Sequence, residues 1–196
     1  MEANNLGHFN KGVGEFKKVS FEQFKKDWLK ASPTNKNDWT DEELKAVYDA
    51  IPIPQRGTGD KNRPGMGAAG YDIIAPCDIN LAFGKSVVIP TGLSCQINDG
   101  WDLDIYPRSG HGFKYGIRLA NTVGIIDNDY YGSPDNEGHI LVKIVNNEAA
   151  VNENKENFRV AAGKGFCQAI FRIFGTTRND EPQGSRNGGF GSTDRK

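Results

Sequence analysis

From Ile53 onward the chain is a succession of short apolar runs separated by glycine, proline, asparagine and aspartate. Trp101, Leu103 and Ile105 alternate with polar residues, which is the period of a half-buried strand. This stretch contains no long helical pattern. Many short strands with frequent turn residues predict an all-β fold, a sandwich or a jelly-roll-like barrel. The candidate strands are Ser86–Pro90, Leu93–Ile97, Leu103–Tyr106, Ile140–Val145, Phe158–Ala161 and Cys167–Phe174.

The first fifty residues carry a different pattern. Ser20–Gln23 and Thr40–Glu43 both have the sequence of a capping box. In this motif the first hydroxyl accepts a hydrogen bond from the backbone amide three residues later, and the side chain of that later residue accepts one from the first backbone amide. Apolar residues follow each box at helical spacing until prolines interrupt them. We therefore expect two short amphipathic helices between about residues 20 and 50, and a loose segment over residues 1–15.

The first expected helix has an aromatic face, formed by Phe21, Phe24 and Trp28. We expect this face to pack on the β fold. A surface for a protein partner is the open alternative, because an unpaired aromatic face is also typical of binding sites.

Charge, hydropathy and cysteine content argue against several classes of protein. The chain has 24 Lys and Arg against 25 Asp and Glu, so it lacks the basic footprint of a protein that binds polymeric nucleic acid. Its apolar runs are far shorter than the ~20 residues of a membrane span, and Met1–Asn5 does not begin a signal peptide. Cys77, Cys95 and Cys167 form no CxxC pair, which argues against a disulfide framework or a zinc site. We expect a cytoplasmic protein, or one of the host cytoplasm if a virus or phage encodes it.

Two segments offer groups for a phosphate or a metal ion. Ala68–Ala75 places a single carboxylate, Asp72, at the expected entry of a strand. Pro107–Gly112 places Arg108 and Ser109 among glycines, which let a backbone approach a ligand closely. From the residues alone, a surface aspartate and a solvated turn are the competing interpretations.

Two further segments are ambiguous in the same way. Asn121–Gly132 has the pattern of a β-hairpin with Asn128 in its turn, but its acid and aromatic residues could also face a nucleoside. Arg186–Thr193 is glycine-rich and could be a flexible tail or a wrap of backbone amides around an anion. It is not a Walker A loop.

In their order along the chain these segments resemble the motifs of the trimeric dUTPase family. Ala69–Asp72 is similar to its Ala-Gly-x-Asp motif, Pro107–Gly110 to Pro-Arg-Ser-Gly, and Gly188–Thr193 to its Gly-Gly-Phe-Gly-Ser-Thr tail. Asn121–Tyr130 matches the pattern Asn-x-x-Gly-x-Ile-Asp-x-Asp-Tyr, and Gly163–Phe171 lies where the family has Gly-Asp-Arg-Ile-Ala-Gln. The resemblance covers about residues 51 to 194.

The resemblance implies hydrolysis of dUTP to dUMP and pyrophosphate on a distorted jelly-roll barrel. Asp127 is then the general base and Asp72 helps to hold a hydrated Mg²⁺. Tyr130 packs beneath the deoxyribose and excludes a 2′-hydroxyl. The other implied substrate-binding residues are Arg108, Ser109, Gly110 and Gln168 at the phosphates, Asn121, Ile125, Ile126 and Leu141 at the nucleoside, and Arg186, Phe190, Gly191, Ser192 and Thr193 in a closing arm.

The family also implies a homotrimer whose sites are shared between subunits. We divide the chain into a helical extension over residues 1–50, a dUTPase-like barrel over 51–175 and a flexible arm over 176–196. The extension could bind a protein partner.

The chain departs from the family pattern at several positions. The arginine of the fourth motif is absent, and Lys164 is offset by one position from its place. Ser133–Gly138 and Ala149–Asn157 resemble loop insertions, and Arg186 lies closer to the glycines than usual. A dCTP deaminase-like enzyme and a nucleotide-gated interaction protein are the alternative functions. We interpret His111 as structural or solvent-facing and Cys167 as a core residue.

Overall fold

The structure is a computed structural model that describes residues 12–34, 36–58, 67–149 and 151–181. Its elements are, in chain order, β1 (Gly14–Lys18), α1 (Phe21–Ala31), α2 (Asp41–Ala50), β2 (Arg56–Thr58), β3 (Gly67–Ile74), β4 (Ile79–Leu81), β5 (Lys85–Pro90), β6 (Leu93–Ile97), β7 (Trp101–Pro107), α3 (Ser109–Tyr115), β8 (Arg118–Leu119), β9 (Gly124–Ile126), the 3-10 turn η2 (Asn128–Tyr130), β10 (Leu141–Asn146), β11 (Phe158–Val160) and β12 (Gly165–Ile173). The fold is mostly β, as predicted.

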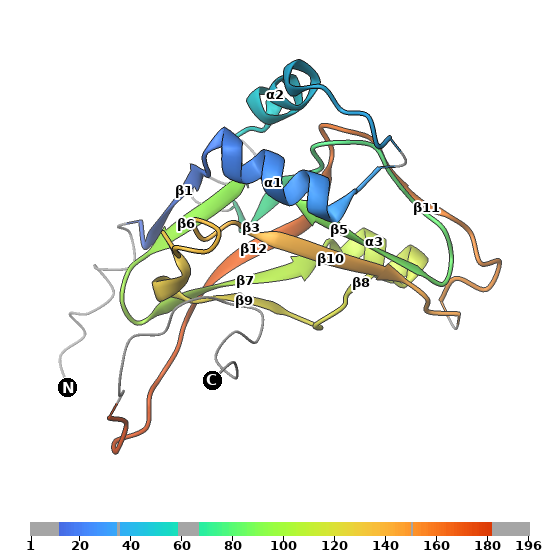
Figure 1. Cartoon of the computed structure of the whole chain (residues 1–196). Coiled ribbons are helices and arrows are strands. Elements are labelled where there is room, and N and C mark those ends of the chain that lie inside the picture. Colours follow the sequence, from blue (N-terminus) through green and yellow to red (C-terminus); the bar gives the residue numbers. More distant parts are fainter. Residues whose placement is uncertain (1–11, 35, 59–66, 150, 182–196) are drawn as a thin grey trace.

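The strands pair antiparallel in small sheets. The largest has the order β2-β3-β12-β7-β9, and β5-β10-β8 forms a second. Two pairs, β1-β6 and β11-β4, complete the sheets of the described residues. Figure 1 shows β7, β9 and β12 running side by side, with the two N-terminal helices above the β layers.

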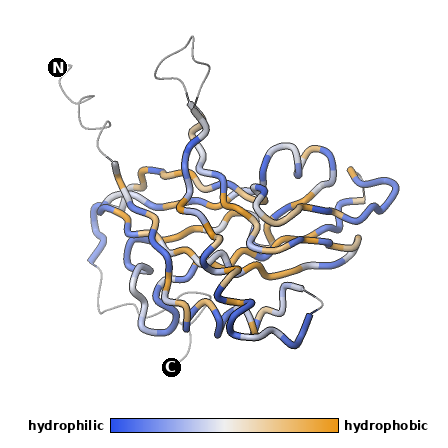
Figure 2. The backbone as a smooth tube through the Cα atoms, turned by 90° about the horizontal axis from the view of Figure 1, so that it is seen from above, coloured by the Kyte–Doolittle hydropathy of each residue, from blue (hydrophilic) through white to orange (hydrophobic). Residues whose placement is uncertain are grey.

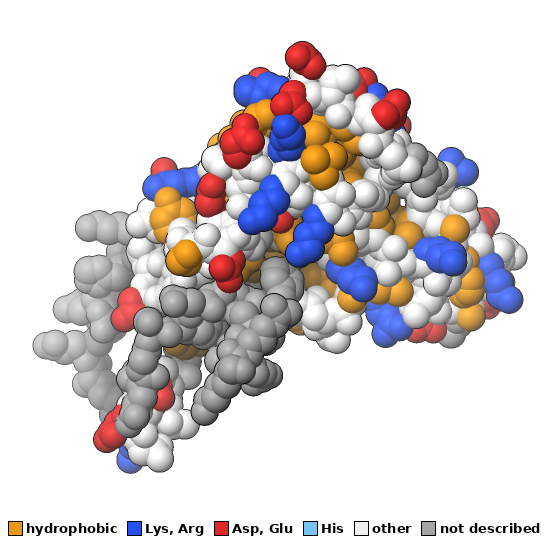
Figure 3. Space-filling view, in the orientation of Figure 1, with side chains coloured by type: hydrophobic (Ala, Val, Ile, Leu, Met, Phe, Trp, Pro, Cys, Tyr) orange, Lys and Arg blue, Asp and Glu red, His pale blue; other side chains and the backbone are white. Residues whose placement is uncertain are grey.

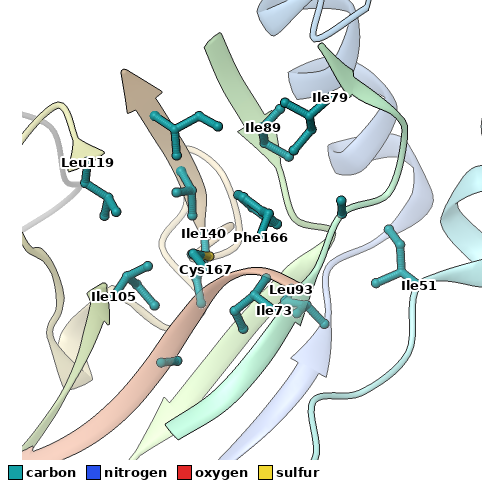
Figure 4. Close-up of a cluster of buried hydrophobic side chains, with 14 of the residues drawn as sticks. Ile51, Ile73, Ile79, Ile89, Leu93, Ile105, Leu119, Ile140, Phe166 and Cys167 are labelled. Carbon is teal, nitrogen blue, oxygen red and sulfur yellow. The ribbon is translucent and has the colours of Figure 1, made fainter. Parts of the chain in front are cut away.

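Apolar side chains gather where the sheets and α1 meet. Hydrophobic segments run through the middle of the body, and hydrophilic segments lie in the outer loops (Figure 2). Ile73, Ile105, Phe166 and Cys167 converge from β3, β7 and β12 in this core (Figure 4). Each is at most 1% exposed, so the prediction that Cys167 is a core residue is confirmed.

Both expected helices are present, and α1 belongs to the same core. Phe24 and Trp28 are fully buried in the cluster that contains the strand residues, and Phe21 packs against it. The aromatic face therefore covers the β fold, as expected. Charged side chains of both signs lie on the outer side of this helical region (Figure 3). No helix in the described part of the chain is long and apolar enough to cross a membrane.

The two capping boxes differ in the structure. Thr40 and Glu43 form the complete box that the sequence predicts. At α1 the Ser20 hydroxyl accepts from the Gln23 amide, but the Gln23 side chain donates to Asp27 instead of reaching back. The backbone amide of Ser20 donates to the Glu137 carboxylate, 117 residues away. A long-range contact thus replaces the local one.

Three further expectations are wrong in detail. Residues 1–15 were expected to be loose, yet Gly14 begins β1 and pairs with Ile97 of β6. A Cβ on Gly14 would lie 2.6 Å from the Phe171 ring, so this close pairing requires glycine. Residues 1–11 lie outside the described residues. The solvated turn that was one interpretation of Pro107–Gly112 is instead the start of α3, and Asn128 begins η2 instead of turning a hairpin.

Candidate active site

One pocket of about 330 Å³ lies between β7, β9, η2 and β10. It brings together the predicted nucleoside-contacting residues that lie in the described part of the chain, and it includes the proposed base. These lining residues are Asn121, Ile125, Ile126, Asp127, Tyr130 and Leu141. Residues from three separate stretches of chain thus form one site.

The edge position of β9 shapes this pocket. β9 pairs with β7 through Ile125 opposite Asp104 and is the last strand of its sheet. Alternate backbone groups of an edge strand face away from its neighbour and can bind a ligand. The strand is reached by a tight turn at Thr122, which has a left-handed φ of 68°. The Leu119–Thr122 bridge closes this turn, so the hairpin lies before β9 and not after it.

The acid and the aromatic residue of the pocket share one 3-10 turn. Asp127 caps η2, and its carbonyl accepts from the Tyr130 amide at 3.2 Å. The Tyr130 hydroxyl donates to the His139 backbone carbonyl at 3.0 Å and accepts from the side-chain amide of Asn136 at 2.6 Å. Burial raises the pKa of Tyr130, so the phenol stays protonated at neutral pH. These contacts fix the ring relative to Asp127.

Acidic side chains of β7 lie behind the pocket. Burial raises the pKa of Asp102, and the charges of Asp104 and Asp127 raise it further. Asp104 accepts from the Tyr106 hydroxyl at 2.6 Å and lies 3.4 Å from Arg172. The alternation of β7 is visible in the sequence, but this network between side chains is not.

A second pocket, of about 690 Å³, lies at the other end of β7. Arg108, Ser109 and Gln168 line it, and Gly110 follows as an exposed residue of α3. The Gln168 amide donates to the Pro107 carbonyl at 3.1 Å. The structure thus places the predicted phosphate ligands of the second and fourth motifs together.

Asp72 belongs to this second site. It lies within β3, five residues after its first residue, and not at the strand's entry as expected. The Arg108 guanidinium lies 3.1 Å from the Asp72 carboxylate and donates to the Gly165 carbonyl at 3.2 Å. A Cβ on Gly70 would lie 2.8 Å from the Gln168 side-chain oxygen, so a larger residue there would displace the Gln168 amide. Lys164 is exposed.

The described residues do not form a closed metal cage. No three His, Cys, Asp or Glu side chains among them come together in a way that could hold a metal ion. Asp72 alone offers a carboxylate, about half exposed, beside the second pocket. A hydrated Mg²⁺ that is held mainly by substrate phosphates requires only one or two such oxygen ligands, so Asp72 fits that role.

The two pockets share β7 as a wall, with Ile105 lining the first and Tyr106 the second, but Asp127 and Arg108 lie at opposite ends of this strand. Asp127 follows Ile126, which pairs with Leu103, whereas Arg108 follows Pro107 at the opposite end of β7. At about 3.4 Å per residue of strand, roughly 20 Å separates the backbone positions of the two residues along β7. One copy of the chain therefore does not bring its Asp127 to its own Arg108.

His111 has a structural environment. Its Nδ1 lies 3.3 Å from the Phe166 carbonyl oxygen, and its ring packs edge-on against Phe158. Burial lowers the pKa of His111, which favours the neutral imidazole. The interpretation of His111 as a satisfied structural histidine is confirmed.

Some predicted residues lie outside the described residues, and some residues at the site were not predicted. The arm residues Arg186, Phe190, Gly191, Ser192 and Thr193 belong to the first group. Asn136 and His139 belong to the second, since neither occurs in a motif. Only their position, Asn136 within the insertion Ser133–Gly138 and His139 directly after it, could have drawn attention to them.

Comparison with known proteins identifies a family. A family model described as dUTPase matches residues 60–194. The deoxyuridine 5′-triphosphate nucleotidohydrolase of Lactococcus lactis is 39% identical over 145 residues, which are 73% of this chain and 88% of that protein. The protein of the same name from Methylococcus capsulatus is 35% identical over 160 residues, which are 74% of this chain and 89% of that protein.

Solved structures agree with these relatives. The crystal structure of dUTPase from Streptococcus mutans matches with a TM-score of 0.55 and 28% identity, over 83% of this chain and 98% of that chain. A mutant dUTPase from phage phi11 of S. aureus, solved with a structural Mg(II) ion, has a TM-score of 0.50 at 18% identity, over 68% of this chain and 91% of that chain, and shares the fold.

Proposed function

The chain belongs to the dUTPase family, and we propose that it hydrolyses dUTP to dUMP and pyrophosphate with Asp127 as the general base. The observation that carries the proposal is the single pocket that joins Asp127, Tyr130 and the edge of β9. This pocket has the size of a small-molecule site and combines apolar walls with one carboxylate.

The base and sugar of the nucleotide are recognised in this pocket. Asn121 and the outward-facing backbone of Ile125 and Ile126 bind the polar edge of uracil, and Leu141 contributes an apolar wall. The ring of Tyr130 lies under the deoxyribose. Because the Tyr130 hydroxyl is held at two points, the ring cannot easily move to accommodate a 2′-hydroxyl. This selects dUTP over UTP.

The chemical step is the attack of water on the α-phosphorus, which breaks the bond from this phosphorus to the oxygen that bridges the α- and β-phosphates. Asp127 takes a proton from the water as its oxygen attacks, and the bridging oxygen leaves with pyrophosphate. Arg108, Ser109, Gly110 and Gln168 donate to phosphate oxygens. Mg²⁺, when bound, neutralises charge on the triphosphate, and Asp72 would hold its hydration shell.

The separation of Asp127 from Arg108 along β7 supports a shared site. Asp127 and Arg108 must reach the same triphosphate, yet roughly 20 Å of β7 lies between them in one chain. A homotrimer, with its sheets in a jelly-roll barrel, would place Asp127 of one copy beside Arg108 of another. In this assembly the arm over residues 176–196, including Arg186, Phe190, Gly191, Ser192 and Thr193, closes on the nucleotide. The three buried, unpaired cysteines agree with a cytoplasmic location.

A substrate panel tests the proposed function. The purified chain with Mg²⁺ is offered dUTP, UTP, dCTP and dTTP, and pyrophosphate and ammonia are measured. We expect pyrophosphate from dUTP at a rate at least about a hundredfold above that from UTP. Ammonia from dCTP would instead identify a deaminase, and no pyrophosphate from dUTP would refute the proposal. Removal of residues after Gln183 should strongly reduce the rate if the arm closes the site.

A further inference from the structure

We propose that helix α1 positions the nucleoside pocket, through a buried chain of hydrogen bonds from Asp27 to His139 to Tyr130. The inference rests on the proposed function of Tyr130 as the residue beneath the sugar. α1 spans Phe21–Ala31 and lies before residues 60–194, the part of the chain that matches the family. The family match therefore assigns no role to this helix.

The first link is the contact between Asp27 and His139. His139 is fully buried and Asp27 is 7% exposed. The Nδ1 atom of His139 lies 2.6 Å from an Asp27 carboxylate oxygen, and Nε2 accepts from the Gly92 amide at 2.8 Å. Since Nε2 is an acceptor, Nδ1 carries the proton and donates it to Asp27. Both ring nitrogens are satisfied, which fixes the orientation of the ring.

The second link runs from His139 to the pocket. The His139 carbonyl accepts from the Tyr130 hydroxyl, and the His139 amide donates to the Asn136 carbonyl at 2.9 Å. The Asn136 side chain in turn donates to the same Tyr130 hydroxyl. The position of the Tyr130 ring therefore depends on where the backbone of His139 is held, and α1 holds its side chain.

A second set of contacts ties the rim of the same loop to α1. The Glu137 carboxylate accepts from the Ser20 amide at 2.7 Å and from the Ser20 hydroxyl at 2.6 Å. Lys26 donates to the Asp135 carbonyl at 3.3 Å. The start and the middle of α1 thus both form hydrogen bonds with the insertion Ser133–Gly138. These bonds hold the loop insertion against the helix.

The insertion Ser133–Gly138 also packs closely against Tyr130. Gly138 has a φ of 74°, and a Cβ there would lie 2.5 Å from the Tyr130 carbonyl oxygen. The loop backbone is therefore packed directly on the backbone of the tyrosine. A displacement of the loop away from α1 must be transmitted to Tyr130.

Substitutions at Asp27 can distinguish an effect on the position of the Tyr130 ring from an effect on the stability of the fold. Both Gln23 and His139 bond to the same carboxylate oxygen, so the amide oxygen of Asp27→Asn can accept from both. Asp27→Leu keeps the branching at Cγ with a somewhat larger side chain, but leaves the Nδ1 proton of His139 unpaired. Leu44→Val is the matched control, because Leu44 is buried in α2 and takes no part in the chain of hydrogen bonds.

The readouts are the Kd for α,β-imido-dUTP, the ratio of kcat/KM for dUTP to that for UTP, and Tm. We expect Asp27→Leu to weaken analogue binding and to reduce the dUTP-to-UTP ratio, each roughly tenfold. Asp27→Asn should restore both to within about threefold of the wild type. Leu44→Val should lower Tm with the ratio unchanged.

The inference is overturned if Asp27→Leu lowers Tm but keeps the Kd and the ratio, or if Leu44→Val changes the ratio equally. Should Asp27→Leu not fold, Glu137→Ala decides the question, since Glu137 is only partly buried and its substitution removes both bonds to Ser20. Unchanged analogue binding would then reject the inference. If the wild type does not hydrolyse dUTP, the proposed function fails, whereas the comparison of analogue binding still tests the role of α1.

Discussion

The Arg108 guanidinium lies 3.1 Å from the Asp72 carboxylate while it donates to the Gly165 carbonyl at 3.2 Å. One side chain thus joins the first, second and fourth of the sequence motifs. Both charged groups are close to half exposed, so the pair adds little to folding stability. Its consequence is that the guanidinium is already oriented at the second pocket before a phosphate binds.

Arg108→Lys should therefore lower kcat/KM for dUTP by about tenfold or more, with Tm unchanged within a degree or two. The ammonium group lacks the planar fork that contacts Asp72 and Gly165 together. Steady-state kinetics and thermal unfolding measure the two effects. Arg118→Lys is the matched control, because the Arg118 side chain donates to the exposed Asn147, away from both pockets. Equal losses in the two variants would contradict a specific role for Arg108.

Gly138→Ala should destabilise the protein by about 2 kcal/mol or more and weaken dUTP binding. The position has a φ of 74°, and an added Cβ would lie 2.5 Å from the Tyr130 carbonyl oxygen. Gly132→Ala is the control in the same loop, since Gly132 has a φ of 69° but open space around it. Denaturant titration should give the larger loss for Gly138→Ala, and a higher KM for that variant alone. The same KM for both variants would speak against close packing of the loop on Tyr130.

The three cysteines should not react with a thiol reagent in the folded protein. Burial raises the pKa of Cys77 and of Cys95 to about 12, and raises that of Cys167 well above its usual range. Nearly no thiolate is then present at pH 8. Ellman's reagent should report no free thiol at that pH until denaturant is added, and then three. A fast reaction of even one cysteine in the folded state would contradict the buried placement.

The contribution of Asp27 to stability should depend on pH. Burial by itself would raise the pKa of Asp27, but hydrogen bonds from His139 and Gln23 and the charge of Lys26 bring it below its ordinary value of 3.8. A carboxyl whose pKa is lowered in the folded state stabilises the fold at a pH above the unfolded pKa, and this contribution disappears as pH falls through the folded pKa. Unfolding free energies of wild type and Asp27→Asn should therefore differ at pH 7 and converge below about pH 4. A difference that is constant with pH would refute this assignment.

The sequence predicted the strands and helices that depend on residues close together in the chain. Leu93–Ile97 is a strand with the predicted bounds, and the box at Thr40–Glu43 caps α2 as expected. Periodicity and capping act within a few residues, so the sequence displays them directly. The family resemblance likewise selected the residues that line the pocket, from Asn121 to Leu141.

What could not be predicted depends on contacts between distant residues. Glu137 occupies the place at Ser20 that the local pattern assigns to Gln23, because the fold brings a charged acceptor to that helix start. β1 forms only because β6 offers a partner strand. The chain from Asp27 to Tyr130 joins residues about a hundred positions apart, and none of its members other than Tyr130 lies in a motif.

The central claim is tested most directly by measuring pyrophosphate release from dUTP by the wild type and by Asp127→Asn, with the Kd for α,β-imido-dUTP measured in parallel. The amide keeps the shape of the side chain but cannot take a proton from water. We expect the wild type to release one pyrophosphate for each dUMP, and Asp127→Asn to lose at least about a hundredfold in kcat while its Kd changes by less than about threefold. Near-normal turnover by Asp127→Asn, or no pyrophosphate from the wild type, would contradict the account.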